Sequence, residues 1–97
     1  MEIAAFQSVI ADTFADRDRR RGLPASVAWL CEEVGELAKA ARKGSPAEQL
    51  EELADVLAWT ASIAGQLGLS LDHAVQRYAN GYPKCDAIPC ACPFARV

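Results

Sequence analysis

Two short acidic motifs contain the residues of this chain that are best suited to chemistry. Glu33 and Glu36 stand three residues apart in the first motif, and Glu52 and Asp55 repeat that spacing in the second. Residues three apart share one face of a helix, so each motif would present a pair of carboxylates. Ligand sets made only of oxygen, held on rigid helices, suit Mg²⁺ or Mn²⁺, which are hard ions that also bind substrate phosphates.

The two pairs would meet if their helices form an antiparallel hairpin. The short connection around Gly44 and Ser45 favours that arrangement, and four carboxylates would then converge across one groove. Such a cluster repels itself unless it is protonated or binds cations, and Asp55 stands among apolar neighbours where an uncompensated charge is costly. A solvated acidic face is the alternative for either motif alone, but the second pair favours a metal site. The sequence has no Glu-x-x-His, which argues against a di-iron carboxylate bundle.

The elements that must position these acids are expected to be helices. Nineteen of the 97 residues are Ala, the best helix former. Apolar residues recur at three- and four-residue spacing and predict amphipathic helices over about 3–19, 24–43 and 46–67. A short fourth helix should begin at Ser70, with its inner positions at Leu71, Ala74, Val75 and Tyr78.

The segment after Asn80 has a different character. Pro83, Pro89 and Pro93 exclude a continuous helix there. We therefore expect one all-α domain, with a helical part at 1–80 and an irregular Cys- and Pro-containing tail at 81–97.

Charge and hydropathy exclude several classes of protein. The formal net charge of -3 argues against nucleic acid or an anionic membrane as a partner, because such binders carry a basic excess. No apolar run reaches the roughly 18 residues of a membrane span, and the first residues lack the pattern of a signal peptide. The expected location is the cytoplasm, where cysteines remain thiols or bind metals.

The length of the chain points to assembly. A domain of 97 residues buries only about 60–65% of its unfolded surface, and Ala-rich helices contribute little apolar area each. A lone chain would be marginally stable, so we expect a homo-oligomer.

The sequence around the acidic motifs resembles a known family. Glu32-Glu33-x-x-Glu36, followed after fifteen residues by Glu52-x-x-Asp55, is similar to the signature of the MazG-like all-α nucleoside triphosphate pyrophosphohydrolases. The flanking residues 29–38 and 52–59 resemble the short single-domain members, as does Arg77-Tyr78 ahead of the tail. The resemblance extends over about residues 5–92.

This resemblance implies a four-helix MazG-like bundle, assembled as a homodimer or a dimer of dimers. It implies hydrolysis of a nucleoside triphosphate, in a non-standard or deoxy form, to the monophosphate and pyrophosphate. Mg²⁺ would be held by Glu33, Glu36, Glu52 and Asp55, with one of these or Glu32 positioning the attacking water. The alternatives are a hydrolase of another phosphoanhydride and a helical oligomerisation or interaction module whose acidic faces are solvated.

Several basic residues are candidates for binding the substrate phosphates. Lys39 lies three residues beyond Glu36 and would reach a phosphate near the metal, and Arg77 on the fourth helix is a second candidate. Arg42 and Lys43 also suit a helix C-terminus, where the dipole favours cations. The cluster at 17–21 is expected to be a solvated helix end, and contact with phosphate from a neighbouring subunit is the alternative.

Trp29, Trp59 and Asn80 complete the candidate substrate-binding residues. Each Trp flanks an acidic pair and would either stack on a base or pack in the core. Asn80 follows the fourth helix, where the resemblance implies contacts to sugar or base.

The tail places Cys85, Cys90 and Cys92 at C-x4-C-x-C spacing. This pattern resembles half of a zinc knuckle, but structural zinc needs four ligands. Free thiols are the favoured interpretation, and a structural zinc ion completed by a second chain is the alternative. Cys31 stands on the apolar stripe of its helix and is expected to pack there.

Overall fold

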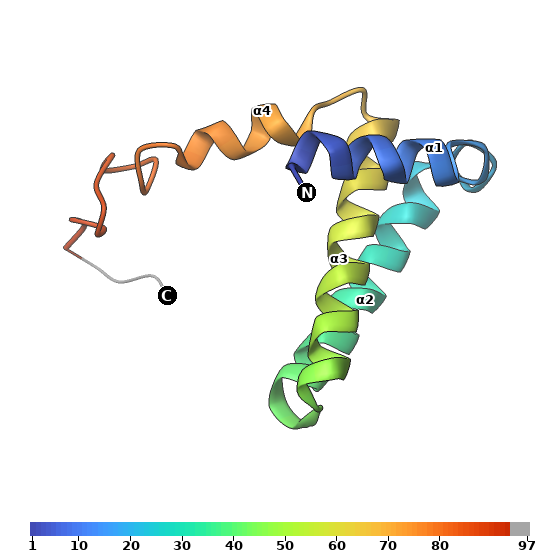
Figure 1. Ribbon diagram of the computed structural model, residues 1–97, viewed down its shortest axis with the longest axis horizontal. Coiled ribbons are helices and arrows are strands. Elements are labelled where there is room, and N and C mark those ends of the chain that lie inside the picture. Colours follow the sequence, from blue (N-terminus) through green and yellow to red (C-terminus); the bar gives the residue numbers. More distant parts are fainter. Residues whose placement is uncertain (94–97) are drawn as a thin grey trace.

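The computed structural model describes residues 1–93, and within that range the regular structure is entirely helical (Figure 1). This confirms the predicted all-α class. The elements are α1 (Ile3–Arg21), α2 (Leu23–Lys43), α3 (Pro46–Gln66), α4 (Leu71–Val75) and a 3-10 turn, η1 (Gln76–Tyr78). No helix in this part of the chain is both long enough and apolar enough to span a membrane.

Two connections fix how the long helices meet. Gly22 separates α1 from α2 with φ of 83°, a left-handed conformation that glycine adopts without strain. Ser45 caps α3 through a capping box, in which its side chain accepts from the Glu48 N–H while the Glu48 carboxylate accepts from the Ser45 N–H. With Pro46 in the first turn, α3 is forced to begin directly after α2 ends.

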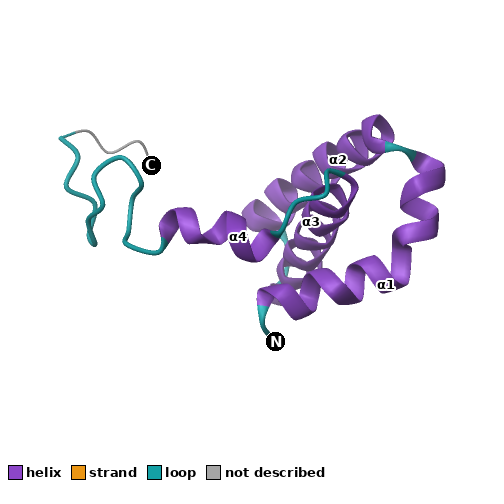
Figure 2. Ribbon diagram, turned by 90° about the horizontal axis from the view of Figure 1, so that it is seen from above, coloured by secondary structure: helices purple, strands orange, loops and turns teal. Residues whose placement is uncertain are grey.

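Helices α2 and α3 form the predicted antiparallel hairpin, and α1 crosses its open end (Figures 1 and 2). The side chain of Gln49 on α3 ties the closed end by donating to the carbonyls of Ala40 and Gly44. The hairpin therefore brings the two acidic motifs to the same interface.

The apolar core of one protomer is small. Its buried hydrophobic residues within the described range are Ile10, Ala40, Ala61 and Ala64. Large apolar side chains on the hairpin remain in contact with solvent, for example Leu50 at 69% exposure and Leu57 at 53%. A single chain thus leaves much of its apolar surface uncovered.

Helix α4 extends away from the hairpin and does not complete a four-helix bundle within the protomer (Figure 2). Gln7 on α1 anchors its start, donating to the Leu69 carbonyl and accepting from the Leu71 N–H. The radius of gyration is 15.6 Å, against about 12.5 Å for a compact domain of this length.

Several positions that the sequence predicts to be buried are exposed in the protomer. Leu71 is half-buried, but the other predicted inner positions of α4 are exposed, and so is Cys31 on α2. The spacing of apolar residues showed which face of each helix is apolar. It could not specify that no element within residues 1–93 covers them.

Candidate functional site

The α2–α3 interface brings together three of the four predicted metal ligands. One carboxylate oxygen from each of Glu33, Glu52 and Asp55 lies within 4.8 Å of the others. Glu33 comes from α2, whereas Glu52 and Asp55 lie one turn apart on α3. The arrangement follows from the three-residue spacing and from the antiparallel packing of the two helices.

Burial and mutual repulsion make this cluster unfavourable without a cation. The Oε2 atom of Glu52 is buried and has no hydrogen-bond partner. Desolvation, followed by the charges of Asp55 and its other acidic neighbours, raises the pKa of both Glu33 and Glu52. An unpartnered buried acceptor next to two other carboxylates fits an oxygen-binding metal ion.

Glu36 and Lys39 lie beside this cluster, in a groove toward the closed end of the hairpin. The groove has a volume of about 210 Å³ and is lined by Glu36, Lys39, Ala40, Lys43, Gly44, Glu48 and Glu52. Glu36 does not join the three converging carboxylates, although its charge contributes to raising the pKa of Glu52. The structure therefore divides the predicted set of four into three converging acids and Glu36, which lies in the adjoining groove.

A second hollow lies on the other side of the cluster. Its volume is about 170 Å³, and it is lined by Phe14, Asp18, Arg21, Asp55, Ala58, Trp59 and Ser62. Asp55 thus lines this hollow, while Glu52 lines the groove. The carboxylate cluster stands between a mostly apolar hollow and a groove that contains two lysines.

Trp29 and Trp59 stack on each other in the protomer. Their ring centroids are 6.0 Å apart and the planes differ by 9°. The guanidinium carbon of Arg21 lies 4.6 Å from the centroid of Trp59, a cation–π distance. Only Trp59 of the two lines the hollow, so Trp59 is the better placed for contact with a ligand there.

A buried polar network behind Trp59 was missed in the sequence. Asp18, only 5% exposed, accepts from Arg21 at 2.7 Å and from the Ser62 hydroxyl at 2.9 Å. Ser26 is fully buried and accepts from Arg21 at 3.2 Å and from Gln66 at 2.9 Å. The network joins α1, α2 and α3, and Arg21 is therefore not the solvated helix end that its basic neighbours suggested.

The remaining predicted site residues lie further out. Glu32 is exposed on α2, and its charge is the smallest of the acidic effects that raise the pKa of Glu33. Arg77 and Asn80 are exposed. They belong to the segment after α4, which extends away from the α2–α3 hairpin (Figure 1). Within one protomer these two residues do not line either hollow beside the acids.

The chain belongs to the MazG nucleotide pyrophosphohydrolase domain family. The family model matches residues 22–85, which include α2, α3 and both acidic motifs. No curated protein matches the sequence significantly.

Proposed function

We propose that this protein is a Mg²⁺-dependent nucleoside triphosphate pyrophosphohydrolase, which converts a nucleoside or deoxynucleoside triphosphate and water to the monophosphate and pyrophosphate. The observation that carries the proposal is the convergence of Glu33, Glu52 and Asp55 within 4.8 Å, including a buried and unpartnered oxygen of Glu52. Membership of the family supports the nucleotide as substrate and pyrophosphohydrolysis as reaction class. Clearance of non-standard nucleotides and a cytoplasmic location stay predictions.

The donor set fits Mg²⁺, with Mn²⁺ as an alternative, because all three ligands are carboxylates. Glu33, Glu52 and Asp55 would hold the ion, and Glu36 would join them from the groove as a fourth acid. When bound, such an ion neutralises phosphate oxygens and makes a coordinated water a better nucleophile. The helices hold the acids in place before substrate arrives, which limits reorganisation during the reaction.

The two hollows suggest how the substrate would lie. Lys39 and Lys43 in the groove offer ammonium groups to the phosphate oxygens, beside the acids Glu36, Glu48 and Glu52. Trp59 and Arg21 line the other hollow and offer the nucleoside an aromatic ring and a guanidinium group. Because Glu52 and Asp55 are three residues apart, only about 4.5 Å of helix rise separates the acid that lines the groove from the acid that lines the hollow.

An assembled homodimer, or a dimer of dimers, would complete the site. The hollows measure about 170 and 210 Å³, below the roughly 300 Å³ at which small-molecule pockets begin. Exposed apolar residues on both hairpin helices, including Val34, Leu53 and Leu57, offer a surface for a second chain. That second chain would also supply a wall near the phosphates, and could bring Arg77 and Asn80 to the nucleotide.

The direct test is pyrophosphate release from a panel of standard and modified nucleoside triphosphates, with and without Mg²⁺. We expect pyrophosphate and monophosphate in equal amounts, only when Mg²⁺ is present. Orthophosphate as product would instead indicate a hydrolase of another phosphoanhydride. No product from any member of the panel would leave a helical interaction module as the better interpretation.

A further inference from the structure

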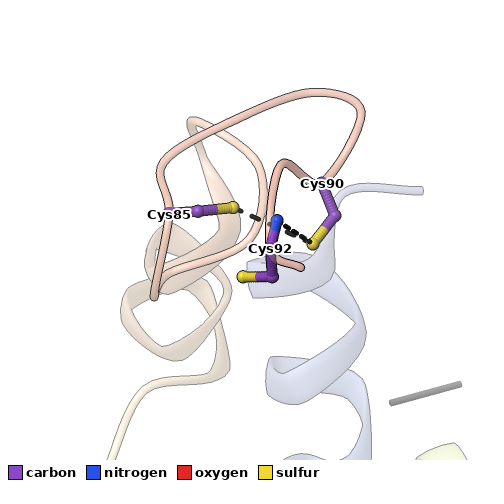
Figure 3. Close-up of side chains that lie close together, drawn as sticks. All are labelled: Cys85, Cys90 and Cys92. Atoms are coloured by element: carbon purple, nitrogen blue, oxygen red, sulfur yellow. Dashed lines mark hydrogen bonds between the residues drawn. The ribbon is translucent and has the colours of Figure 1, made fainter. Parts of the chain in front are cut away.

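Three thiols of the tail point toward one another although no helix positions them (Figure 3). The Sγ atoms of Cys85, Cys90 and Cys92 all lie within 4.8 Å of one another. The sulfurs of Cys85 and Cys90 are 3.9 Å apart. Zn–S bonds of about 2.3 Å in a tetrahedral site place two thiolates about 3.8 Å apart. At least one pair therefore already has the spacing of zinc ligands.

Backbone amides orient two of these sulfurs. The Ala91 N–H donates to the Cys85 sulfur at 3.5 Å. The Cys92 N–H donates to the Cys90 sulfur at 3.4 Å (Figure 3). Hydrogen bonds of this kind stabilise a thiolate and fix its direction, as the outer shell of a metal site does.

A tight turn holds Cys85 opposite the other two cysteines. The carbonyl of Tyr82 accepts from the Cys85 and Asp86 N–H groups at 3.1 and 2.6 Å, and the Tyr82 N–H donates to the Ala87 carbonyl. Gly81 adopts φ of 104°, and a Cβ there would lie 2.2 Å from the Ala87 oxygen. The turn thus depends on glycine, and it brings the chain back so that the thiols face one another.

The same segment has no apolar core to stabilise it. No residue from 79 to 93 is buried. A segment of this kind needs a cross-link or a metal to stay folded. A disulfide would use two thiols and leave the third unused, whereas a metal ion uses all three.

We propose that Cys85, Cys90 and Cys92 bind one Zn²⁺ ion as three thiolates, and that this ion fixes the tail. The protons of the three thiols pass to solvent on binding. No fourth Cys, His or acidic residue joins the group within residues 1–93, so the fourth position is left for water or for a ligand from a second chain. Soft thiolates favour Zn²⁺ over Mg²⁺, and this site is therefore separate from the carboxylates and independent of the proposed hydrolysis.

The test is metal binding by the untagged full chain, reduced and freed of metal. We expect one equivalent of Zn²⁺ per chain, and Co²⁺ in its place should give the sulfur charge-transfer absorption of a thiolate-rich tetrahedral site. Cys90→Ser and Cys85→Ser should each weaken zinc binding by more than about 100-fold. Cys31→Ser is the matched control, because Cys31 is an exposed thiol on α2, and it should bind zinc like the wild type.

Limited trypsin digestion adds a readout that does not depend on the spectrum. Lys84 is exposed inside the turn, and bound Zn²⁺ should slow cleavage after it in the wild type and in Cys31→Ser but not in Cys90→Ser. Less than about a tenth of an equivalent of zinc would overturn the proposal. Equal zinc binding by the wild type and Cys90→Ser, or a Cys85–Cys90 disulfide in the protein as isolated, would overturn it as well.

Discussion

The carboxylate cluster and the thiol cluster are alike in size but are held by different kinds of structure. Each gathers three ligand residues whose donor atoms lie within 4.8 Å. The carboxylates stand on two long helices that pack against each other, whereas the thiols stand on a tail without regular structure beyond one bridge between Tyr82 and Ala87. The oxygen ligands of the first cluster are hard and suit Mg²⁺, whereas the sulfur ligands of the second are soft and suit Zn²⁺.

The difference lies in what holds each cluster together. Helix packing and the network around Asp18 keep the carboxylates close even though they repel one another. The tail has only backbone turns and two N–H···S contacts to hold its thiols. We therefore expect metal at the carboxylates to serve chemistry on a scaffold that is already folded, and metal at the thiols to serve folding of the segment itself.

Asp55→Asn should produce the largest effect, on the helical site alone. It removes one of three converging charges while keeping the size of the side chain. The proposed Mg²⁺ ion then loses one of its carboxylate ligands, and with it part of its hold on the substrate phosphates. We expect pyrophosphate release to fall by at least about 100-fold, with helical circular dichroism unchanged.

Glu51→Gln is the matched control for that variant. Glu51 adjoins Glu52 in sequence but is exposed and stands outside the cluster. It should keep the activity of the wild type within a few-fold. Full activity in Asp55→Asn would contradict the assignment of Asp55 as a metal ligand.

Chelation followed by adding back one ion at a time should separate the two sites. Mg²⁺ should restore pyrophosphate release without protecting the tail from trypsin at Lys84, because thiolates bind Mg²⁺ poorly. Zn²⁺ should protect the tail. Restoration of both properties by Mg²⁺ alone would show that the tail is ordered by the helical site and not by its own thiols.

Asp18→Ala should weaken the scaffold that holds the carboxylates. The substitution leaves the Arg21 guanidinium with only Ser26 and Trp59 as partners, and Ser62 loses its acceptor. We expect the free energy of unfolding, measured in urea, to fall by about 2 kcal/mol.

The control for this scaffold variant is Asp12→Ala, an exposed position on the same helix. It should change stability by less than about 0.5 kcal/mol. Zinc binding by the tail should be the same in both variants, because the thiols do not depend on α1. A loss of zinc in Asp18→Ala would show that the two regions are coupled.

The same contrast explains how much the sequence could predict. The three-residue spacing and the short connection at Gly44 and Ser45 were enough to predict the helices, the hairpin and the meeting of the acids. The network of Asp18 with Ser62 joins residues 44 positions apart and has no local pattern. The thiol cluster depends on Gly81 in a left-handed conformation, which spacing between cysteines does not encode.

The direction of α4, away from the hairpin, could not be predicted from the sequence for another reason. Apolar residues predict that a face is covered but not which chain covers it. Tyr78 and Val75 were assigned to the interior on that basis, yet in the protomer they are 60% and 44% exposed. Within residues 1–93, no part of the protomer buries these two side chains.

The pH dependence of stability without metal should give the smallest effect. The pKa values of Glu33 and Glu52 are raised above the ordinary 4.5, so the folded protein holds protons that the unfolded chain releases. Their contribution to stability is therefore complete below pH 4.5 and is lost as the pH rises through the raised values. Burial opposes the ionisation of both groups most strongly, followed by the charge of Asp55. The charges of Glu52 and Glu32 add to the effect on Glu33, and those of Glu36 and Glu51 add to the effect on Glu52.

The comparison of wild type with Glu52→Gln isolates this effect from all other titrations. Glutamine stays neutral, so without metal the variant should gain stability over the wild type as the pH rises from below 4.5 toward 8. Saturating Mg²⁺ should reverse the order at high pH, because only the wild type has the full ligand set. A difference that does not change with pH would mean that Glu52 is not protonated more readily in the folded state. The Cys90→Ser variant should follow the wild type throughout, because Cys90 lies on the tail and outside the hairpin.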